Sequence, residues 1–175
     1  SVNPDLIYEN LYKWIENKQI IAIGEIGLED LTDSEIAIFK KQLDIGEETK
    51  TKVIVHTPRK NKKEVLKVIQ DIVPQHIDPK LVVIDHINQN VAEDVIDKDY
   101  TLGLTVQPQK MDKEEAIAIL DEYGFDKFLL NSDISNKPSD PLSVPKTVRE
   151  LEKLGYKKTE IEKVAFKNAE KFFKI

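Results

Sequence analysis

The chain has 175 residues, of which 40% are hydrophobic and 33% charged, a composition typical of a folded globular domain and not of a disordered chain. Its net charge of −6 argues against broad electrostatic binding to a nucleic-acid backbone, and the absence of cysteine excludes disulfides and thiolate chemistry. No apolar run approaches the roughly 18 residues that span a bilayer, so we expect no membrane contact and a cytoplasmic location.

Short apolar segments alternate along the chain with longer segments of helical periodicity. The first helix is expected to begin at Pro4 with Asn3 as its cap, and strands rich in β-branched residues are expected at 19–24, 53–55, 81–84, 101–106 and 128–130. Further helices are expected from the capping box at 32–35, over 64–73, near 91–96, from Asp112 to Gly124, from Ser143 to Gly155, and from Thr159, with Glu162 in the box position. This alternation predicts one α/β domain with a parallel sheet.

Residues that can bind metals follow four of the five expected strands. Glu25 comes directly after the first strand, His56 after the second, His86 after the third and Asp133 after the fifth. The first three lie about 30 residues apart, which is one strand–helix–strand step. Because the carboxyl ends of parallel strands meet at one edge, these side chains are expected to converge there.

Two imidazoles and two carboxylates form a mixed nitrogen and oxygen donor set. Such a set suits Zn²⁺, Mn²⁺ or Fe²⁺ better than Ca²⁺. A single histidine at a strand end is more often structural than a ligand, but two of the chain's three histidines occupy these positions. We therefore expect Glu25, His56, His86 and Asp133 to form a metal site. The third histidine, His76, is expected to be an ordinary surface residue on the opposite face.

A run of cations follows His56 on the same edge. Arg59, Lys60 and Lys62 lie before and at the start of a helix, where their charge opposes the helix dipole. The functional interpretation is a clamp for a phosphate or another anionic substrate. A solvated, lysine-rich loop is the commoner meaning of such a run. The polar segment over 135–143 also has two interpretations. It is either a loop at the rim of the site or an ordinary turn.

Five motifs carry a resemblance to a known family. They are GEIGLE at 24–29, VHTPR at 55–59, IDH at 84–86, NSD at 131–133 and NAEKFF at 168–173. In this order they resemble the TatD family of metal-dependent hydrolases, a branch of the amidohydrolase superfamily, and in particular an uncharacterised archaeal subgroup. The resemblance implies a TIM-barrel-type (β/α) architecture. Residues 1–175 would be a single partial-barrel domain, holding the C-terminal five or so βα units and the closing helices.

The resemblance also implies roles for the four candidate ligands. Glu25 would bridge two divalent ions (Zn, Mn, Mg, Fe or Ni), with His56 and His86 completing one site. Asp133 would hold the other ion and orient the attacking water as the catalytic residue. The expected chemistry is metal-assisted hydrolysis of a phosphodiester, as in a deoxyribonuclease, or of a related ester or amide, with a small-molecule or nucleic-acid phosphoester as substrate.

The chain departs from the family pattern in four respects. It contains no His-x-His pair, which the family carries on its first strand, and it has five expected strands where a barrel has eight. Residues 131–132 are Asn-Ser where the nucleases usually have Glu-Thr, and 84–88 also differs from them. The first three βα units are therefore expected to be missing, and self-association or a partner chain would cover the open barrel edge.

These departures leave two alternatives to a two-metal hydrolase. One is a catalytically silent partial barrel that acts as a scaffold or as a subunit needing another segment to complete the metal site. The other is an enzyme with a single ion held by Glu25, His56 and His86, in which Asp133 acts as the base, since three protein ligands and a water suffice for a catalytic zinc site.

Overall fold

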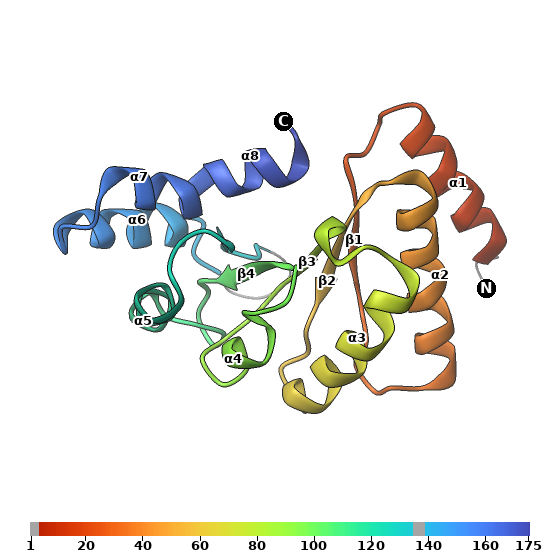
Figure 1. Ribbon diagram of the computed structural model, residues 1–175, viewed down its shortest axis with the longest axis horizontal. Coiled ribbons are helices and arrows are strands. Elements are labelled where there is room, and N and C mark those ends of the chain that lie inside the picture. Colours follow the sequence, from red (N-terminus) through yellow and green to blue (C-terminus); the bar gives the residue numbers. More distant parts are fainter. Residues whose placement is uncertain (1–3, 135–138) are drawn as a thin grey trace.

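The computed structural model describes residues 4–134 and 139–175. A five-stranded parallel sheet in the order β1-β2-β3-β4-β5 lies at its centre (Figure 1). The strands are β1 (Ala22–Gly27), β2 (Lys52–His56), β3 (Val82–Ile84), β4 (Thr101–Thr105) and β5 (Phe128–Asn131). The expected parallel α/β sheet is confirmed. Each strand pairs with the next along the chain, as in a barrel wall, and β1 and β5 form the two ends of the described sheet.

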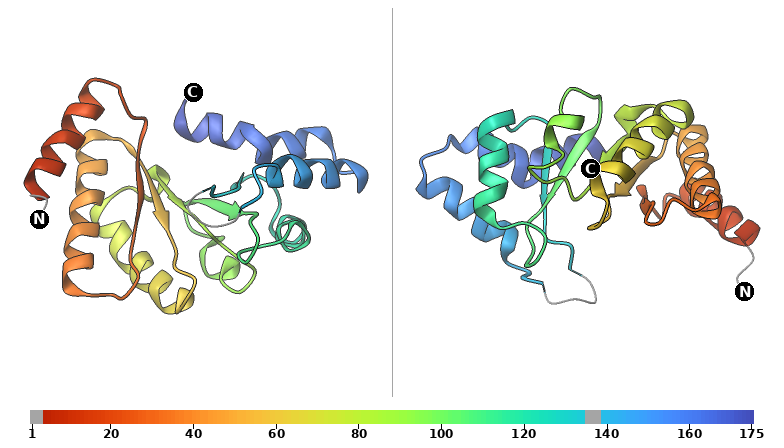
Figure 2. Two further views of the ribbon diagram at one scale, coloured as in Figure 1. Left: turned by 180° about the vertical axis from the view of Figure 1, so that it is seen from behind. Right: turned by 90° about the horizontal axis from the view of Figure 1, so that it is seen from below.

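Helices pack beside both ends of this sheet. They are α1 (Pro4–Glu16), α2 (Asp33–Thr49), α3 (Lys62–His76), α4 (Ala92–Val95), α5 (Lys113–Tyr123), α6 (Ser143–Lys153), α7 (Lys158–Glu162) and α8 (Asn168–Phe173), with a 3-10 turn at Pro79–Leu81 and a π-helical turn at Lys163–Lys167. The pair α2 and α3 packs beside β1 and β2, whereas α6, the π-helical turn and α8 lie against β5 (Figure 2). No helix in the described ranges is long and apolar enough to cross a membrane.

The helix ends follow the capping chemistry of the sequence in two cases out of three. Thr32 caps α2 in a complete capping box with Glu35. Asp112 caps α5, which ends at Gly124 with φ 80°. The box expected at Thr159 is wrong, because the helix begins one residue earlier, at Lys158, and its N-cap Lys157 makes no side-chain cap hydrogen bond. Asn3 lies outside the described residues.

Strand β1 differs from its expected position in a way that matters for the site. It runs from Ala22 to Gly27 and so contains Glu25, which was expected to follow it. Its pairing with β2 is irregular between Ile23 and Ile26. These two isoleucines are buried, while Gly24 and Glu25 between them are exposed. The irregularity therefore keeps both isoleucines in the core and leaves the Glu25 carboxylate free to face the site.

Candidate metal centre

Three of the four predicted ligands lie close together at the carboxyl ends of β1, β2 and β3. Oε1 of Glu25 lies 3.1 Å from Nε2 of His86. The rings of His56 and His86 meet edge to face, with centroids 5.9 Å apart. Parallel pairing produces this convergence, because each chain segment leaves its strand at the same edge of the sheet.

Thr105 and Asp85 determine which nitrogen of His86 faces Glu25. The Thr105 hydroxyl donates to Oδ1 of Asp85 at 3.2 Å, so its oxygen is left to accept a hydrogen bond from Nδ1 of His86 at 2.7 Å. The proton of the neutral ring therefore resides on Nδ1. The lone pair of Nε2 then points toward Glu25, as a metal-binding imidazole requires.

Asp85 holds both His86 and Thr105 in position. Its Oδ1 accepts hydrogen bonds from the backbone N–H of His86 at 2.7 Å, from Thr105 and from Nδ2 of Asn131 at 2.9 Å. Gly103 makes room for it, since a Cβ at that position would lie 2.0 Å from Oδ1.

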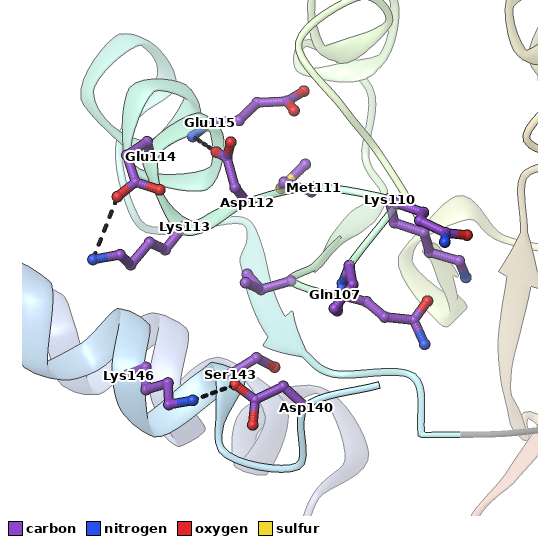
Figure 3. Close-up of a pocket in the computed structure, with 13 residues that line it drawn as sticks. Gln107, Lys110, Met111, Asp112, Lys113, Glu114, Glu115, Asp140, Ser143 and Lys146 are labelled. Carbon is purple, nitrogen blue, oxygen red and sulfur yellow. Dashed lines mark hydrogen bonds and ion pairs between the residues drawn. The ribbon is translucent and has the colours of Figure 1, made fainter. Parts of the chain in front are cut away.

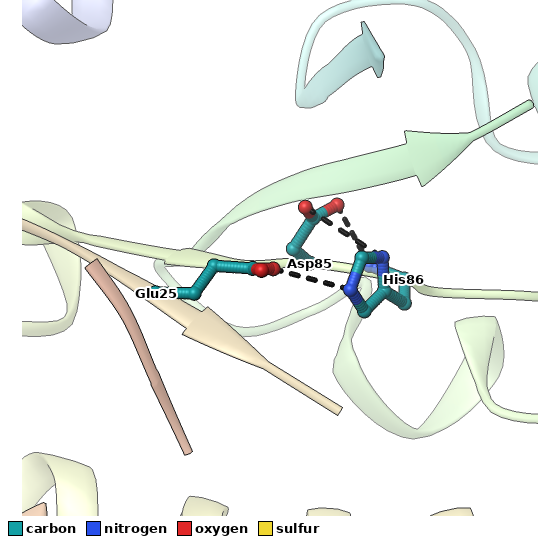
Figure 4. Close-up of side chains that lie close together, drawn as sticks. All are labelled: Glu25, Asp85 and His86. Atoms are coloured by element: carbon teal, nitrogen blue, oxygen red, sulfur yellow. Dashed lines mark hydrogen bonds and ion pairs between the residues drawn. The ribbon is translucent and has the colours of Figure 1, made fainter. Parts of the chain in front are cut away.

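The donor atoms of Glu25, Asp85 and His86 all lie within 4.8 Å of one another, a grouping that could hold an ion (Figure 4). However, Asp85 approaches the Nδ1 side of the ring, with Oδ2 at 3.7 Å, whereas Glu25 approaches Nε2. An ion bound to Nε2 would lie beyond the reach of a carboxylate on the other side of the ring. Asp85 is thus better suited to orienting His86 than to binding the ion.

His86 lies in a strained turn that Thr57 and Lys62 hold in place. Its φ of 61° belongs to the left-handed region, which residues with a Cβ rarely adopt. The Thr57 hydroxyl donates to the carbonyl of Asp85 at 2.9 Å. The Lys62 ammonium donates to the carbonyl of His86 at 2.9 Å and to Oγ1 of Thr57 at 2.6 Å. Burial, with a smaller contribution from Lys110, lowers the pKa of Lys62 to about 8.

His56 occupies a more open position than His86. Its Nε2 lies 3.1 Å from Oε1 of Glu29, which is largely exposed. Burial lowers the pKa of His56 and outweighs the opposing attraction of Glu29 and Glu25, which favours the neutral ring that a metal needs. Gly27 allows the close approach of this ring, since a Cβ there would lie 2.1 Å from its Cδ2.

Glu25 is held as a carboxylate by the histidines around it. When the His86 ring carries protons on both nitrogens, Nε2–H donates to Glu25, and this hydrogen bond lowers the pKa of the carboxyl group against the opposing effect of its burial. When the ring is neutral, the Nε2 lone pair and the carboxylate are two acceptors that face the same small space. Two facing acceptors are stable only around a proton or a cation.

Asp133 is connected to the other ligands through a lysine. Its Oδ2 forms an ion pair with the Lys110 ammonium, which also lies 3.1 Å from Nε2 of His86. Nε2 of Gln107 donates to the Asp133 carbonyl at 2.7 Å, which fastens the segment after β5, where Asp133 has φ 41°, to the loop after β4. Asp133 thus faces the site, and the cation between it and His86 is the ammonium of Lys110.

Two cavities border these residues. One, of about 100 Å³, is lined by Thr57, Arg59, Lys62, His86 and Lys110 among others. The other, of about 490 Å³, lies between the loop after β4 and the starts of α5 and α6 (Figure 3). Lys110 lines both cavities. Lys60 is exposed, and His76 lies apart from the site, 2.7 Å from Asp44. Residues 135–138 of the polar segment lie outside the described residues.

The comparison with family models decides the classification. The model of the TatD related DNase family matches residues 2–174, nearly the whole chain. The chain belongs to this family. The assignment that the motifs suggested is therefore confirmed.

Relatives of the TatD family agree with this classification. An uncharacterized metal-dependent hydrolase of Methanocaldococcus jannaschii is 37% identical over 99% of this chain and 69% of its own length. The crystal structure of a TatD-like protein from Archaeoglobus fulgidus is 34% identical and has a TM-score of 0.76 over 96% of this chain and 66% of that one. A TatD homologue from Escherichia coli is 18% identical and has a TM-score of 0.71 over 99% of this chain and 72% of that one.

The chain thus spans about two thirds of the length of these TatD relatives. The similarity in structure confirms the expected TIM-barrel-type architecture. The family and its metal-dependent hydrolase relative favour the expected hydrolase over a catalytically silent scaffold. The specific metal, the substrate and the roles of individual residues stay predictions.

Proposed function

We propose that this TatD-family chain carries the main part of a divalent-metal site that hydrolyses phosphodiesters or related phosphoesters. The observation that carries the proposal is the pair formed by Glu25 and His86. A carboxylate and an imidazole lone pair face each other at 3.1 Å, with the tautomer of the ring fixed from behind by Thr105. Supporting groups of this kind are typical of metal-binding histidines.

The residues fit a divalent cation chemically. Glu25, His56, His86 and Asp133 supply nitrogen and oxygen donors suited to zinc, manganese, iron or nickel. The Lys110 ammonium between His86 and Asp133 indicates that this space attracts positive charge. When bound, a divalent ion would supply Lewis-acid activation of water and polarisation of the scissile bond. A site with two ions bridged by Glu25 remains a prediction, and so does the alternative with a single ion.

Asp133 is the residue that we propose for proton transfer. Its carboxylate faces the space beside His86 and is partly exposed, so it could accept a proton from an attacking water. The contact of the Gln107 amide with the Asp133 carbonyl supports a fixed position for this group. Its ion pair with Lys110 would have to open for this role.

The predicted anion clamp divides into three separate proposals. Arg59 is exposed and lines the cavity beside His86, so its guanidinium is the best placed to bind a substrate phosphate. Lys62 lines the same cavity, but its ammonium is engaged with backbone and threonine oxygens, which supports an indirect contribution through its charge. Lys60 is exposed, and its role as a substrate contact remains a prediction.

The first test is metal content, measured by inductively coupled plasma mass spectrometry on protein purified without chelator. We expect at least one equivalent of a divalent transition metal, retained in a Lys63→Met control and lost in Glu25→Gln and His86→Ala. Hydrolysis of bis(p-nitrophenyl) phosphate and of a single-stranded oligonucleotide should follow the metal content across these proteins. Protein that neither carries nor binds metal would refute the proposal for this chain.

A second result would separate metal binding from catalysis. Asp133→Asn keeps the shape of the side chain but removes its capacity to act as a base. We expect this variant to lose phosphodiester hydrolysis by roughly two orders of magnitude or more, the usual contribution of a general base, while it keeps the ion held by Glu25, His56 and His86. Unchanged activity would remove Asp133 from the mechanism.

Three further expectations stay predictions. They are the cytoplasmic location, the organisation of 1–175 as a single domain, and the covering of the open sheet edge by self-association or by a partner chain. Size-exclusion chromatography with light scattering would test the last of these directly.

A further inference from the structure

The Lys110 ammonium lies between two of the predicted metal ligands, against the face of the His86 ring and beside the carboxylate of Asp133. It lies 3.1 Å from Nε2 and 3.4 Å from Nδ1 of His86 and forms an ion pair with Oδ2 of Asp133. The side chain is only 13% exposed. A largely buried ammonium against the face of His86 is not a solvated surface charge.

The loop that carries Lys110 is fixed at both ends. Met111 and Gln107 form an isolated antiparallel bridge, and the N–H of Lys110 donates to the Gln107 carbonyl at 3.0 Å. Gln109 has φ 70°, which lets the chain reverse direction within this short segment. Because Gln107 also donates to the Asp133 carbonyl, the loop is held to β5 as well as to β4. The base of the lysine is therefore fixed, and its flexible side chain can change direction.

A metal ion held by the predicted ligands would compete with this ammonium for the carboxylate of Asp133, which already forms an ion pair with it. The ammonium lies over the face of the His86 ring, so an ion bound to the Nε2 lone pair at roughly 2.0–2.1 Å would lie beside it, at about 4 Å. The two cations would also repel each other at that separation. Metal binding is therefore expected to displace the ammonium from between His86 and Asp133.

The displaced ammonium has space available beside the site. Lys110 lines the cavity of about 100 Å³ that also contains Arg59 and His86. It lines the cavity of about 490 Å³ on the other side of the loop as well (Figure 3). In that larger cavity Lys113 already pairs with Glu150, and Lys146 with Asp140, so their charges are neutralised. After displacement Lys110 would remain a cation beside the metal, on the wall that both cavities share.

We infer that Lys110 is an exchangeable cation. It holds His86 and Asp133 together before metal binds, and after metal displaces it, it binds an anionic oxygen of the phosphoryl group. This inference rests on the proposed function and adds a specific residue to it. The chemical class of the ligand is a phosphate monoanion or dianion, and Arg59 on the same cavity would provide the second cationic contact.

The test compares Lys110→Met with the natural protein in two binding measurements. Metal affinity is measured by titration calorimetry of the chelator-treated protein with Zn²⁺ or Mn²⁺. Binding of inorganic phosphate is then measured on the metal-loaded protein. We expect the variant to bind metal roughly tenfold more tightly, because no ammonium competes, and phosphate roughly tenfold more weakly, because one charged hydrogen bond is lost.

The expected changes in metal affinity and phosphate affinity have opposite signs, which distinguishes this inference from a general loss of structure. A variant that had simply lost structure would bind both ligands more weakly. Lys113→Met is the matched control, since it removes the same charge three residues away at the larger cavity and makes no contact with His86 or Asp133 among the described contacts. Its two affinities should match those of the natural protein.

The outcomes also separate this inference from the proposed function. If the natural protein binds no metal, the proposed function fails, and the exchange fails with it. If it binds metal but Lys110→Met changes neither affinity, only the inference about Lys110 is wrong. Weaker metal binding in Lys110→Met, with a folded circular dichroism spectrum, would show that the lysine supports the site and does not compete for it.

Discussion

Oγ1 of Thr105 lies 2.7 Å from Nδ1 of His86, and this single contact determines what the other edge of the ring can do. The threonine hydroxyl donates its only hydrogen to Asp85, so toward the ring it can only accept. The ring must then carry its proton on the threonine side, and Nε2 keeps its lone pair toward Glu25. The function proposed for the site depends on this lone pair.

Replacement of Thr105 by valine tests the contact directly. Valine keeps the shape of the side chain but leaves the buried Nδ1–H of His86 without an acceptor. We expect metal affinity to fall roughly 10–100-fold, as for other supporting groups of metal-binding histidines. We also expect the free energy of unfolding of the metal-free protein to fall by about 1–3 kcal/mol. Titration calorimetry and urea denaturation measure the two effects.

The control for this substitution lies on the same strand. Thr101→Val changes the other end of β4, away from His86, and should leave metal affinity unchanged. Equal losses of affinity in both variants would mean that the strand as a whole, and not the hydroxyl of Thr105, determines the site.

Gly27 offers a steric test of the position of His56. A Cβ at Gly27 would lie 2.1 Å from Cδ2 of the ring, so Gly27→Ala must displace it. Overpacking of this kind typically costs about 1–3 kcal/mol, and here it should also weaken metal binding. We expect a thermal unfolding midpoint several degrees lower, together with a clear loss of bound metal in mass spectrometry.

Gly46→Ala is the matched variant for this test. Its Cβ would lie 2.6 Å from Cγ2 of Val53, within the core between α2 and β2. It should therefore destabilise the fold to a similar extent without loss of metal affinity. A parallel loss of metal in Gly46→Ala would indicate that general destabilisation, and not the position of the His56 ring, controls binding.

Much of this architecture could be predicted from the sequence, because the signals were local. Buried parallel strands appear as short runs of β-branched residues, and ligands directly after such strands must converge at one edge. The start of β1 could not be read in this way. The apolar run at 19–24 begins and ends three residues before the observed strand, Ala22–Gly27, and the irregular pairing near Gly24 depends on the neighbouring strand.

The groups that support the predicted ligands could not be predicted from the sequence, for a different physical reason. Thr105 and Lys110 follow no ligand-like pattern, and each acts through a contact with a residue about twenty positions away. In the sequence Asp85 stands out only as part of the IDH motif at 84–86, although it accepts three hydrogen bonds. Such roles arise from distances across the sheet. The one local signal was Gly103 in the middle of a strand, which marks the close approach of another group.

Lys62 provides a prediction about pH, measured on metal-free protein. Burial lowers its pKa from 10.5 to about 8, so between these values the unfolded chain binds more protons than the folded one. Its contribution to stability is therefore greatest above pH 10.5 and is lost as the pH falls through 8. In Lys62→Met this dependence disappears. The free energy of unfolding of the natural protein, minus that of the variant, should accordingly rise from pH 8 to pH 10, as measured by urea denaturation. A constant or falling difference would contradict the assigned burial of the ammonium.

Metal binding should itself stabilise the fold, because the ligands come from strands that are far apart in the sequence. Glu25, His56, His86 and Asp133 converge only when β1, β2, β3 and β5 are in register. An ion that binds only the folded state adds about 2.7 kcal/mol at a concentration 100 times its dissociation constant. For a chain of this size that corresponds to a rise of roughly 5–10 °C in the unfolding midpoint. Calorimetry of chelator-treated protein with and without Zn²⁺ or Mn²⁺ measures the rise.

In Glu25→Gln the same addition of metal should give almost no shift in the unfolding midpoint, since the carboxylate opposite Nε2 of His86 is gone. A shift of equal size in Glu25→Gln would mean that the ion binds elsewhere on the surface, and the site would then have to be sought away from the Glu25–His86 pair.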